Sequence, residues 1–335
     1  QEGRSSSERA RRSCSETPRV RAAVTLFLGT VSNVLPLFAL IALGAILRPA
    51  SMLPEDFIST SSKLVFRIAL PVMVFRRLSQ IESVPAELFA GIGLFAGVAL
   101  LIVAFLWILL RRVPGEQSAA AVQGAFRSNI AIVGLAVIEI AYGPAAVAYG
   151  AVVLATIMPL YNVLAVMVLS DGTRQEGESP LRRVAIGLAK NPLIWAVVAG
   201  LGFALLGTTL PAAGDRTLEY LSRLTLPLAL IGIGASLDFS SLMHRSGLWT
   251  LATLVKLIGV PGLVLAGGAL MQIETEALRV LVITAACPTA VASFPMARAL
   301  GADGRLAGEI VSVTTLGSIA TLTLWMMVVE VLPVG

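Results

Sequence analysis

Apolar residues come in long runs, separated by short polar segments, along almost the whole chain. A helix that crosses the hydrocarbon core of a bilayer needs about 20 predominantly apolar residues. Ten runs approach this length, and we expect a membrane-spanning helix in each. These runs cover residues 22–47, 59–79, 86–110, 117–140, 144–170, 183–206, 216–237, 247–271, 276–299 and 304–332. The pattern therefore predicts an all-α membrane protein with ten transmembrane helices.

Parts of the first half of the chain recur in the second half at nearly constant spacing. Residues 67–75 (RIALPVMVF) resemble residues 223–231 (RLTLPLALI), which lie 156 positions later. A second set recurs at an offset of 158: Gly143, Gly150 and Thr156 match Gly301, Gly308 and Thr314. Because the first copy contains five spans, an odd number, the second copy enters the membrane from the opposite face. The sequence thus predicts a five-plus-five inverted repeat.

The longest polar linker falls between the two predicted copies and fixes the expected domain boundaries. We expect an N-terminal extension without fold at 1–21 and a first five-helix repeat at 22–170. A linker at 171–182 and a second five-helix repeat at 183–332 follow. Short loops on the linker side carry twelve Lys and Arg residues, against five on the other side. The positive-inside rule therefore predicts a cytoplasmic linker and both termini outside.

Composition agrees with a lipid environment and excludes several other classes. Hydrophobic residues make up 56% of the chain and charged residues 13%, whereas soluble domains carry roughly 25% charged residues. The net charge of +5 does not indicate a nucleic-acid partner, because the arginines lie between apolar runs rather than on one face. Two cysteines and one histidine give no metal-binding spacing, so we expect no metal or other cofactor.

Polar residues and prolines interrupt two of the predicted spans at matching places. The fourth span contains Ser128 and Asn129, and the ninth contains Pro288, Thr289 and Ser293. Proline lacks an N–H group and clashes with the preceding turn, so it leaves carbonyl groups unpaired. Backbone with unpaired polar groups is tolerated within the membrane only where it is buried in the protein or lines a cavity. We therefore expect both helices to break near the bilayer centre, and these five residues to contribute to a substrate site.

Two further features of these spans bear on that prediction. Pro295 should interrupt the ninth span a second time, and half-helix N-termini at such breaks would present N–H groups to an anion. In the alternative interpretation, Pro288 and Pro295 only kink a packing helix whose small residues contact its neighbours.

Charged residues within the apolar runs are the remaining candidates. Lys256 lies in the middle of the eighth span, where a charge costs about 2.5–3.5 kcal/mol on insertion scales. It would face a polar cavity, attracting an anion or offsetting carbonyls of a broken helix; a snorkelling lysine is the alternative. Glu139 and Glu309 are candidates for ion coupling, although their positions near span ends favour solvated carboxylates. Arg127 lies close to a span start, which favours an interfacial anchor over a substrate contact.

The order and spacing of these motifs resemble the auxin efflux carrier family, in particular its bacterial members. Residues 126–135 followed by Tyr142 and Gly143 resemble the fourth-span signature of the family, and residues 287–301 resemble the ninth. Shorter matches lie at residues 191–195, 226–234, Lys256 with Pro261, and 314–318. The resemblance covers residues 30–332. Plant members have prolines where this chain has Ser128 and Ala136, so the break in the fourth span must depend on other residues.

The resemblance implies a fold similar to sodium/proton antiporters and bile acid symporters. In that fold helices four and nine are broken and cross near the bilayer middle. Helices 1, 2, 6 and 7 form a scaffold, and helices 3–5 and 8–10 form a transport domain that moves in an elevator mechanism. By carry-over, Asn129, Pro288 and Thr289 fall at the crossing. Plant members export auxin, bacterial relatives are linked to malate or malonate, and relatives form homodimers.

We therefore expect a secondary active transporter of a small organic anion, such as a carboxylate or an auxin-like acid, in the bacterial inner membrane. Coupling to H⁺ or Na⁺ stays open. The alternative is a sodium/proton antiporter or a sodium-coupled organic anion symporter on the same fold; a channel or a receptor is a further alternative. An intramembrane protease is not expected, since no pair of mid-span aspartates and no second histidine is present.

Overall fold

The computed structural model describes residues 18–81, 85–171, 186, 189, 191–237 and 247–331. In this part of the chain all the secondary-structure elements are helices, apart from one isolated β-bridge. The helices of the first half are α2 (Pro18–Leu47), α3 (Glu55–Leu64), η1 (Val65–Ala69), α4 (Leu70–Ser79), α5 (Ala86–Leu109), α6 (Gly115–Phe126), η2 (Ile130–Gly134) and α7 (Leu135–Asp171). Those of the second half are α9 (Pro192–Leu205), α10 (Ala212–Arg223), α11 (Thr225–Ser236), α12 (Gly247–Leu254), η4 (Val255–Gly259), α13 (Val260–Leu270), α14 (Thr275–Ala286), α15 (Ser293–Ala299) and α16 (Gly304–Val331).

Within the described residues, six helical segments are long and apolar enough to cross a membrane. They are Glu55–Ser79, Ala86–Leu109, Ile130–Ser170, Ala212–Ser236, Gly247–Leu270 and Gly304–Val331, and two shorter apolar helices cover Val34–Leu47 and Pro192–Leu205. The all-helical membrane class predicted from the apolar runs is therefore confirmed.

Broken helices explain why two of the ten predicted spans do not form long helices of their own. Two predicted spans, 117–140 and 276–299, are interrupted, so neither forms one continuous helix. The second half of the fourth span continues instead into the fifth, and α7 contains both. Gly143 marks the junction inside α7, with φ 81° and ψ −177°. Only glycine adopts this backbone conformation readily, and the helix changes direction there.

The ends of the chain and the central linker are only partly described. Helix α2 begins at Pro18, inside the extension expected at 1–21, and proline is well suited to the first position of a helix. Residues 1–17 and the linker expected at 171–182 lie outside the described part of the chain, except for Asp171 at the end of α7.

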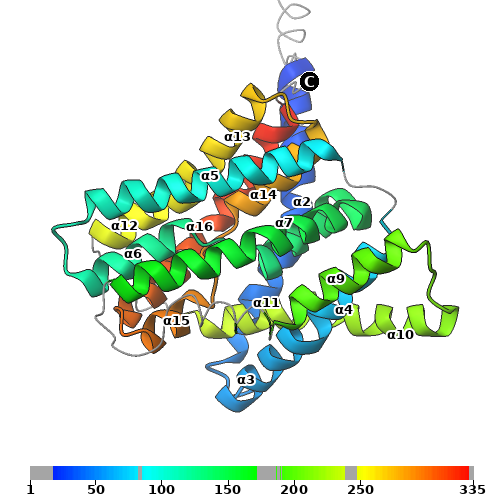
Figure 1. The fold of residues 1–335 in the computed structure, drawn as a ribbon, viewed down its shortest axis with the longest axis horizontal. Coiled ribbons are helices and arrows are strands. Elements are labelled where there is room, and N and C mark those ends of the chain that lie inside the picture. The colour runs from blue at the N-terminus through cyan, green and yellow to red at the C-terminus, as the bar shows by residue number, and fades with distance from the viewer. Residues whose placement is uncertain are drawn as a thin grey trace, which may run out of the picture.

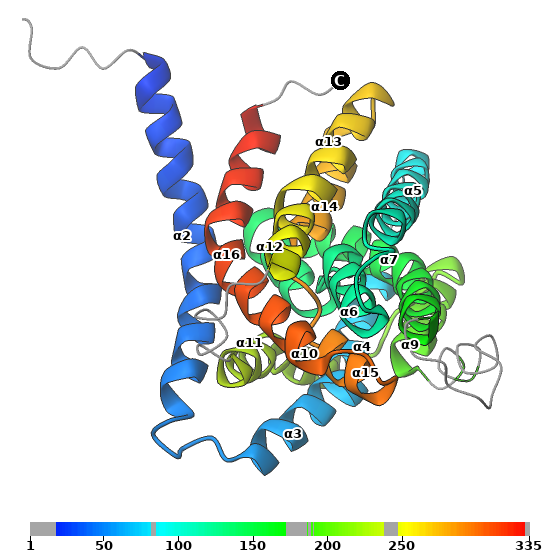
Figure 2. The same ribbon diagram turned by 90° about the vertical axis from the view of Figure 1, so that its left-hand side faces the viewer.

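Helices from the two halves of the chain pack against each other at glycines. Figure 2 shows α2 at one edge of the molecule, where it contacts α11 and α16. A Cβ atom on Gly44 of α2 would overlap the carbonyl oxygen of Ile231, and one on Gly234 of α11 would overlap that of Ile41. Such close backbone approach is typical of small residues in membrane helix contacts.

The most buried helices are α6 and α14, which lie in the interior of the molecule. Figure 1 shows α6 and α14 among the other helices of the upper part of the view, with α7 running between α5 and α9. Every residue of α6 from Ala119 to Phe126 is buried, and so are nine of the twelve residues of α14. Both interior helices end at a break, which places these breaks inside the protein rather than at its surface.

Two π-helical turns precede prolines. The turn η1 ends two residues before Pro71, and the turn η4 ends two residues before Pro261. A proline cannot donate to the carbonyl four residues earlier, so the helix widens locally at each place. In η4 this irregular turn carries Lys256.

Candidate functional site

Two interrupted helices meet in the interior and share backbone hydrogen bonds. Helix α6 ends at Phe126 and α14 ends at Ala286; Ser128 and Thr289 then pair as an isolated antiparallel β-bridge. The N–H of Asn129 donates to the carbonyl oxygen of Pro288 at 2.8 Å, and the N–H of Ala290 donates to that of Arg127 at 2.9 Å. The two freed backbone segments therefore satisfy each other, as buried polar backbone requires. We call this region the crossing.

Side chains complete the hydrogen bonding of the crossing. The hydroxyl of Thr289 donates to the carbonyl oxygen of Gly124 at 2.7 Å. The hydroxyl of Thr314 on α16 accepts from the N–H of Thr289 at 3.1 Å. The carbonyl oxygen of Asn129 accepts from the N–H groups of Val133 and Gly134, both at 3.1 Å, as the π-helical turn η2 begins. Breaks in both helices are thus held open by specific contacts.

Lys256 is fully buried at the edge of the crossing. Its ammonium donates to the hydroxyl of Ser128 and to the carbonyl oxygen of Ala285, each at 2.7 Å. The carbonyl of Ala285 belongs to the last turn of α14, where the helix dipole places partial negative charge. The structure agrees with one of the roles expected for Lys256, because its ammonium offsets a carbonyl of a broken helix. Snorkelling to an interface is wrong for this residue.

Arg127 lies in the break between α6 and η2 and is only 6% exposed. Nη2 donates to Oδ1 of Asn162 at 2.8 Å, and Nη1 lies 3.2 Å from Sδ of Met296. Among the described residues no carboxylate pairs with this guanidinium. The expected interfacial anchor is therefore wrong. Helix α6 has twelve residues before Arg127 and is about 18 Å long, so it carries the arginine deep into the protein.

A small cavity of about 60 Å³ lies against the crossing. Its polar lining comes from Arg127, Ser128, Asn129 and Tyr161, and the hydroxyl of Tyr161 lies 3.4 Å from that of Ser128. Its apolar lining consists of Phe66, Ile130, Ala131, Ile132, Leu154, Met158, Ala290, Val291 and Ala292. The cavity is large enough to hold water. Lys256 does not line it.

The other predicted residues of the ninth span divide between the crossing and its flank. Pro288 contributes its carbonyl oxygen to the bridge, whereas the buried hydroxyl of Ser293 has no hydrogen-bond partner in the described structure. The second break expected at Pro295 is absent. Pro295 stands in the first turn of α15, where a backbone N–H would have no partner within the helix in any case.

Neither of the two glutamates predicted as coupling candidates lies at the crossing. Glu139 on α7 pairs with Arg77 on α4, and Glu309 on α16 pairs with Arg305 at 3.0 Å. The side chain of Glu309 is 10% exposed, so it is more buried than its position near the end of a span predicted. The reason is that Glu309 lies more than one turn inside α16, where the helix is packed on α15.

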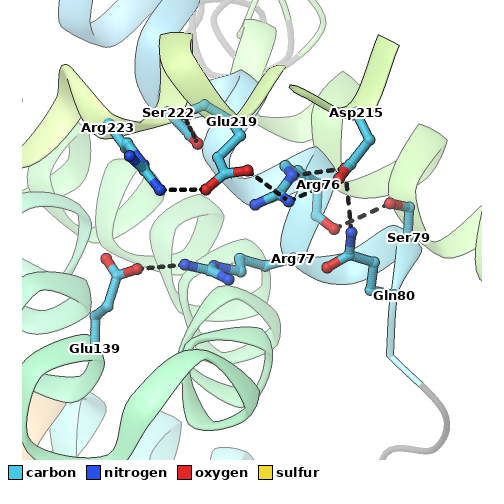
Figure 3. Close-up of polar contacts among 9 residues, drawn as sticks. All are labelled: Arg76, Arg77, Ser79, Gln80, Glu139, Asp215, Glu219, Ser222 and Arg223. Atoms are coloured by element: carbon cyan, nitrogen blue, oxygen red, sulfur yellow. Dashed lines mark hydrogen bonds and ion pairs between the residues drawn. The ribbon is translucent and has the colours of Figure 1, made fainter. Parts of the chain in front are cut away.

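A group of ion pairs joins α4 to α10 and α7, and Figure 3 draws it in close-up. Arg76 forms a two-point contact with Asp215, with Nε to Oδ1 at 2.7 Å and Nη2 to Oδ2 at 2.8 Å. Arg76 also lies 3.6 Å from Glu219, which pairs with Arg223 at 2.5 Å. We call this group, with the Arg77–Glu139 pair, the ion-pair cluster. Every arginine in it has a carboxylate partner.

Two larger cavities are present in the described part of the molecule. One, of about 730 Å³, is lined by Arg77 and Arg279 together with Tyr142, Tyr149 and Glu276. The other, of about 720 Å³, is lined by residues that include Arg48, Asp56, Arg305, Glu309 and Val291. Val291 also lines the small cavity, so the second of these large cavities lies next to it.

Sequence reasoning missed three polar residues near the crossing or undervalued them. Tyr161 is buried in an apolar run, and only its position beside Asn162 pointed to it. Gln123 is fully buried one turn before the break, and neither of its amide atoms has a partner among the described residues. Arg127 was assigned to the interface by its distance from the start of the span. For Gln123 the available signal was a polar residue one turn before a predicted break.

Apolar helices of membrane-spanning length, together with broken helices that meet in the interior, define a membrane transport protein. The family model described as "Membrane transport protein" matches residues 30–326, and the chain belongs to this family. The resemblance to auxin efflux carriers is thereby confirmed, and with it the prediction of an integral membrane transporter.

Curated relatives match over nearly their whole length. A protein of Methanothermobacter thermautotrophicus named "Uncharacterized transporter" is 26% identical over 308 residues, covering 90% of this chain and 99% of the relative. "Uncharacterized transporter YfdV" of Escherichia coli K12 is 26% identical over 322 residues, covering 91% and 98%. A Rhizobium meliloti protein named "Putative malonate transporter" is 27% identical over 304 residues, covering 87% and 92%. Their printed names describe transporters rather than enzymes.

Proposed function

We propose that the protein is a secondary active transporter of a small organic anion that binds at the crossing. The observation that carries this proposal is the guanidinium of Arg127, which is buried beside a cavity and has only neutral partners among the described residues. A buried charge without a counter-charge is costly, and an anion in the cavity would offset that cost.

The chemistry of Arg127 favours a carboxylate as the ligand. A guanidinium has five N–H donors in a planar fork that matches the two oxygens of a carboxylate. Two donors are directed at Asn162 and Met296, which leaves the others for a ligand. The hydroxyl of Tyr161 and the amide of Asn129 supply further polar groups, while the remaining wall is apolar. The relative named as a malonate transporter agrees with this ligand class.

We further propose that the fold has ten spans in two inverted five-helix repeats. Gly44 approaches the carbonyl of Ile231, and Gly200 approaches that of Phe75, where a Cβ atom would lie 2.9 Å from the oxygen. Gly200 lies 156 positions after Gly44, and Ile231 lies 156 positions after Phe75. The contact between α2 and α11 thus recurs between α9 and α4 at the same offset as the sequence repeat.

A second correspondence supports the repeat at its other end. Gly143 and Gly301, which lie 158 positions apart, both have positive φ angles, 81° and 78°. Each glycine lies in a turn between a broken span and the span that follows it. The breaks before these turns pair with each other in the crossing, as expected for two copies related by an axis through the bridge.

Transport would proceed by movement of one helical group past the other. In this proposal α2, α3, α4, α9, α10 and α11 form the scaffold, and α5, α6, α7, α12, α13, α14, α15 and α16 form the transport domain. The two large cavities lie on opposite sides in the predicted topology, one with Arg77 and Arg279 outside and the other with Arg48 and Arg305 inside. Ligand sites of drug-sized molecules occupy about 300–1,000 Å³. The small cavity must therefore widen when the anion enters.

The alternative of a sodium/proton antiporter is less well supported. Exchange of H⁺ for Na⁺ at the crossing would call for a carboxylate there. Among the described residues no carboxylate lines the small cavity, and the two coupling candidates are paired with arginines, Glu139 with Arg77 and Glu309 with Arg305. We place the protein in the bacterial inner membrane, with both termini outside and as a homodimer, on the grounds of the charge distribution and the family.

Reconstitution in liposomes tests the proposal. Uptake of radiolabelled malonate, malate and indole-3-acetate is measured for the wild type, Arg127→Gln and a matched control, Arg223→Gln. A hydrogen bond to a charged group contributes about 1.5–3 kcal/mol, so Arg127→Gln should lower flux of the transported acid about 10–100-fold. Arg223 is 70% exposed, and its substitution should leave flux unchanged. Wild-type flux in Arg127→Gln would contradict the proposal.

A further inference from the structure

We propose that the ammonium of Lys256 is a built-in cation at the crossing, which takes the place of a bound monovalent ion and makes transport independent of Na⁺. This inference rests on the proposed function, because it concerns how the same site works. Its starting point is the pair of contacts from Lys256 to Ser128 and to the carbonyl oxygen of Ala285, each 2.7 Å long.

The oxygens around the ammonium are of the kind that binds an alkali cation in broken-helix transporters. In such proteins, unwound carbonyls and the C-terminal ends of half-helices coordinate the coupling ion. Ala285 lies in the last turn of the half-helix α14, and Ser128 lies in the unwound segment after α6. One positive charge already joins these two oxygens, and its carrier is covalently attached to the protein.

The helix that carries Lys256 is fixed in place, so the ammonium cannot leave as a bound ion would. Pro261 lacks the N–H that would bond to the carbonyl of Leu257, four residues before it. The indole N–H of Trp325 on α16 donates to that carbonyl at 2.8 Å instead. The irregular turn η4 is thereby tied to α16, and the buried side chain of Lys256 extends from it to the crossing.

Lys256 and Arg127 consequently have different roles. The ammonium of Lys256 is occupied by protein oxygens and does not line the cavity, whereas the guanidinium of Arg127 does. Lys256 is thus a positioning residue that holds the two breaks together. Arg127 is the group that would contact the anion. Removal of Lys256 should create a vacant cation position between Ser128 and Ala285.

Thermal unfolding of purified full-length protein tests this inference without any organic anion. Melting temperatures are measured in NaCl, NH₄Cl and choline chloride of equal ionic strength for the wild type, Lys256→Ala and Lys63→Ala. Lys63 is exposed on α3 and serves as the matched control. Wild type and Lys63→Ala should melt alike in the three salts. Lys256→Ala should melt lower in choline, and Na⁺ or NH₄⁺ should raise its melting temperature by about 2 °C or more.

Three results would overturn the inference. One is a Lys256→Ala variant that melts alike in all three salts, and another is a wild type stabilised by Na⁺ relative to choline. The third is a variant that fails to fold in every salt; folding only in Na⁺ or NH₄⁺ would support the inference.

Flux measurements separate this inference from the proposed function. Wild-type uptake of radiolabelled malonate, or of the acid transported best in the liposome experiment, should be equal in NaCl and choline chloride. A requirement for Na⁺ would overturn the role of Lys256 but leave the organic anion transporter standing. Absence of all organic anion flux would contradict the proposed function, while the melting temperatures would still decide the role of Lys256.

Discussion

The ion-pair cluster and the crossing differ in how their positive charges are paired. In the ion-pair cluster Arg76, Arg77 and Arg223 each have a carboxylate within ion-pair distance. At the crossing Arg127 and Lys256 bond to an amide, a hydroxyl and a backbone carbonyl, and no carboxylate pairs with either among the described residues. Paired charges hold helices together in the cluster, whereas at the crossing Lys256 joins the two breaks and Arg127, in our proposal, binds the anion.

The difference also separates stability from function. Loss of an arginine from the ion-pair cluster leaves a carboxylate unpaired, so the protein should become less stable while the crossing is unchanged. Loss of Arg127 removes a charge that is desolvated in the folded state, so stability should hold or rise while anion binding is lost. Besides the reconstitution of Arg127→Gln, three substitution experiments can break this contrast or sharpen it.

Charge reversal at the crossing should have the largest effect. Arg127→Glu replaces attraction with repulsion toward an anion, and like charges placed together cost several kcal/mol. Uptake of the transported acid by liposomes should fall about 100-fold or more. The same reversal at the exposed Arg223 is the control, and it should leave flux unaltered. Equal losses at both positions would show that flux responds to overall charge rather than to this site.

The second largest effect should be on stability, at Arg76. Arg76→Gln removes a two-point contact with Asp215 and leaves Asp215 and Glu219 without their shared partner. We expect a loss of about 1–3 kcal/mol, measured as a lower melting temperature in detergent. The exposed Arg216, next to Asp215 on α10, is the control, and Arg216→Gln should change stability by less than about 0.5 kcal/mol. Impaired anion binding in Arg76→Gln would contradict the assignment of stability to the ion-pair cluster and of binding to the crossing.

The smallest effect should come from the Arg77–Glu139 pair, which joins α4 to α7. A double-mutant cycle with Arg77→Gln and Glu139→Gln isolates the coupling between the two residues. Their side chains are 18% and 25% exposed, so we expect about 1 kcal/mol. The more exposed Arg223–Glu219 pair, treated in the same way, should give about 0.3–0.5 kcal/mol. Stronger coupling in the exposed pair would contradict the role of burial.

The sequence predicted the breaks because their causes are local. Prolines and polar residues within apolar runs mark the fourth and ninth spans, and both helices are interrupted there. Asn129, Pro288 and Thr289 contact one another's segments as the family resemblance implied. The contribution of Ser293 is still a prediction, since its hydroxyl has no partner among the described residues.

The sequence could not predict the partners of the two cations, because these depend on tertiary structure. Lys256 bonds to the backbone of Ala285, and a carbonyl leaves no trace in the side-chain pattern. Arg127 was predicted to lie at the membrane interface because its depth in the membrane was counted from the start of an apolar run. The helix before it begins at Gly115 and its last eight residues are buried, so the arginine that follows lies in the interior. Depth in a broken helix cannot be read from residue number alone.

The most direct test of the central claim is a comparison of ligand binding with stability in Arg127→Gln. Purified wild type and variant are titrated with malonate, malate and indole-3-acetate while their melting temperatures are recorded. At least one acid should raise the melting temperature of the wild type and leave that of the variant unchanged, and without ligand the variant should melt at the same temperature or higher. An equal rise in both proteins would contradict the assignment of Arg127 as the anion-binding charge.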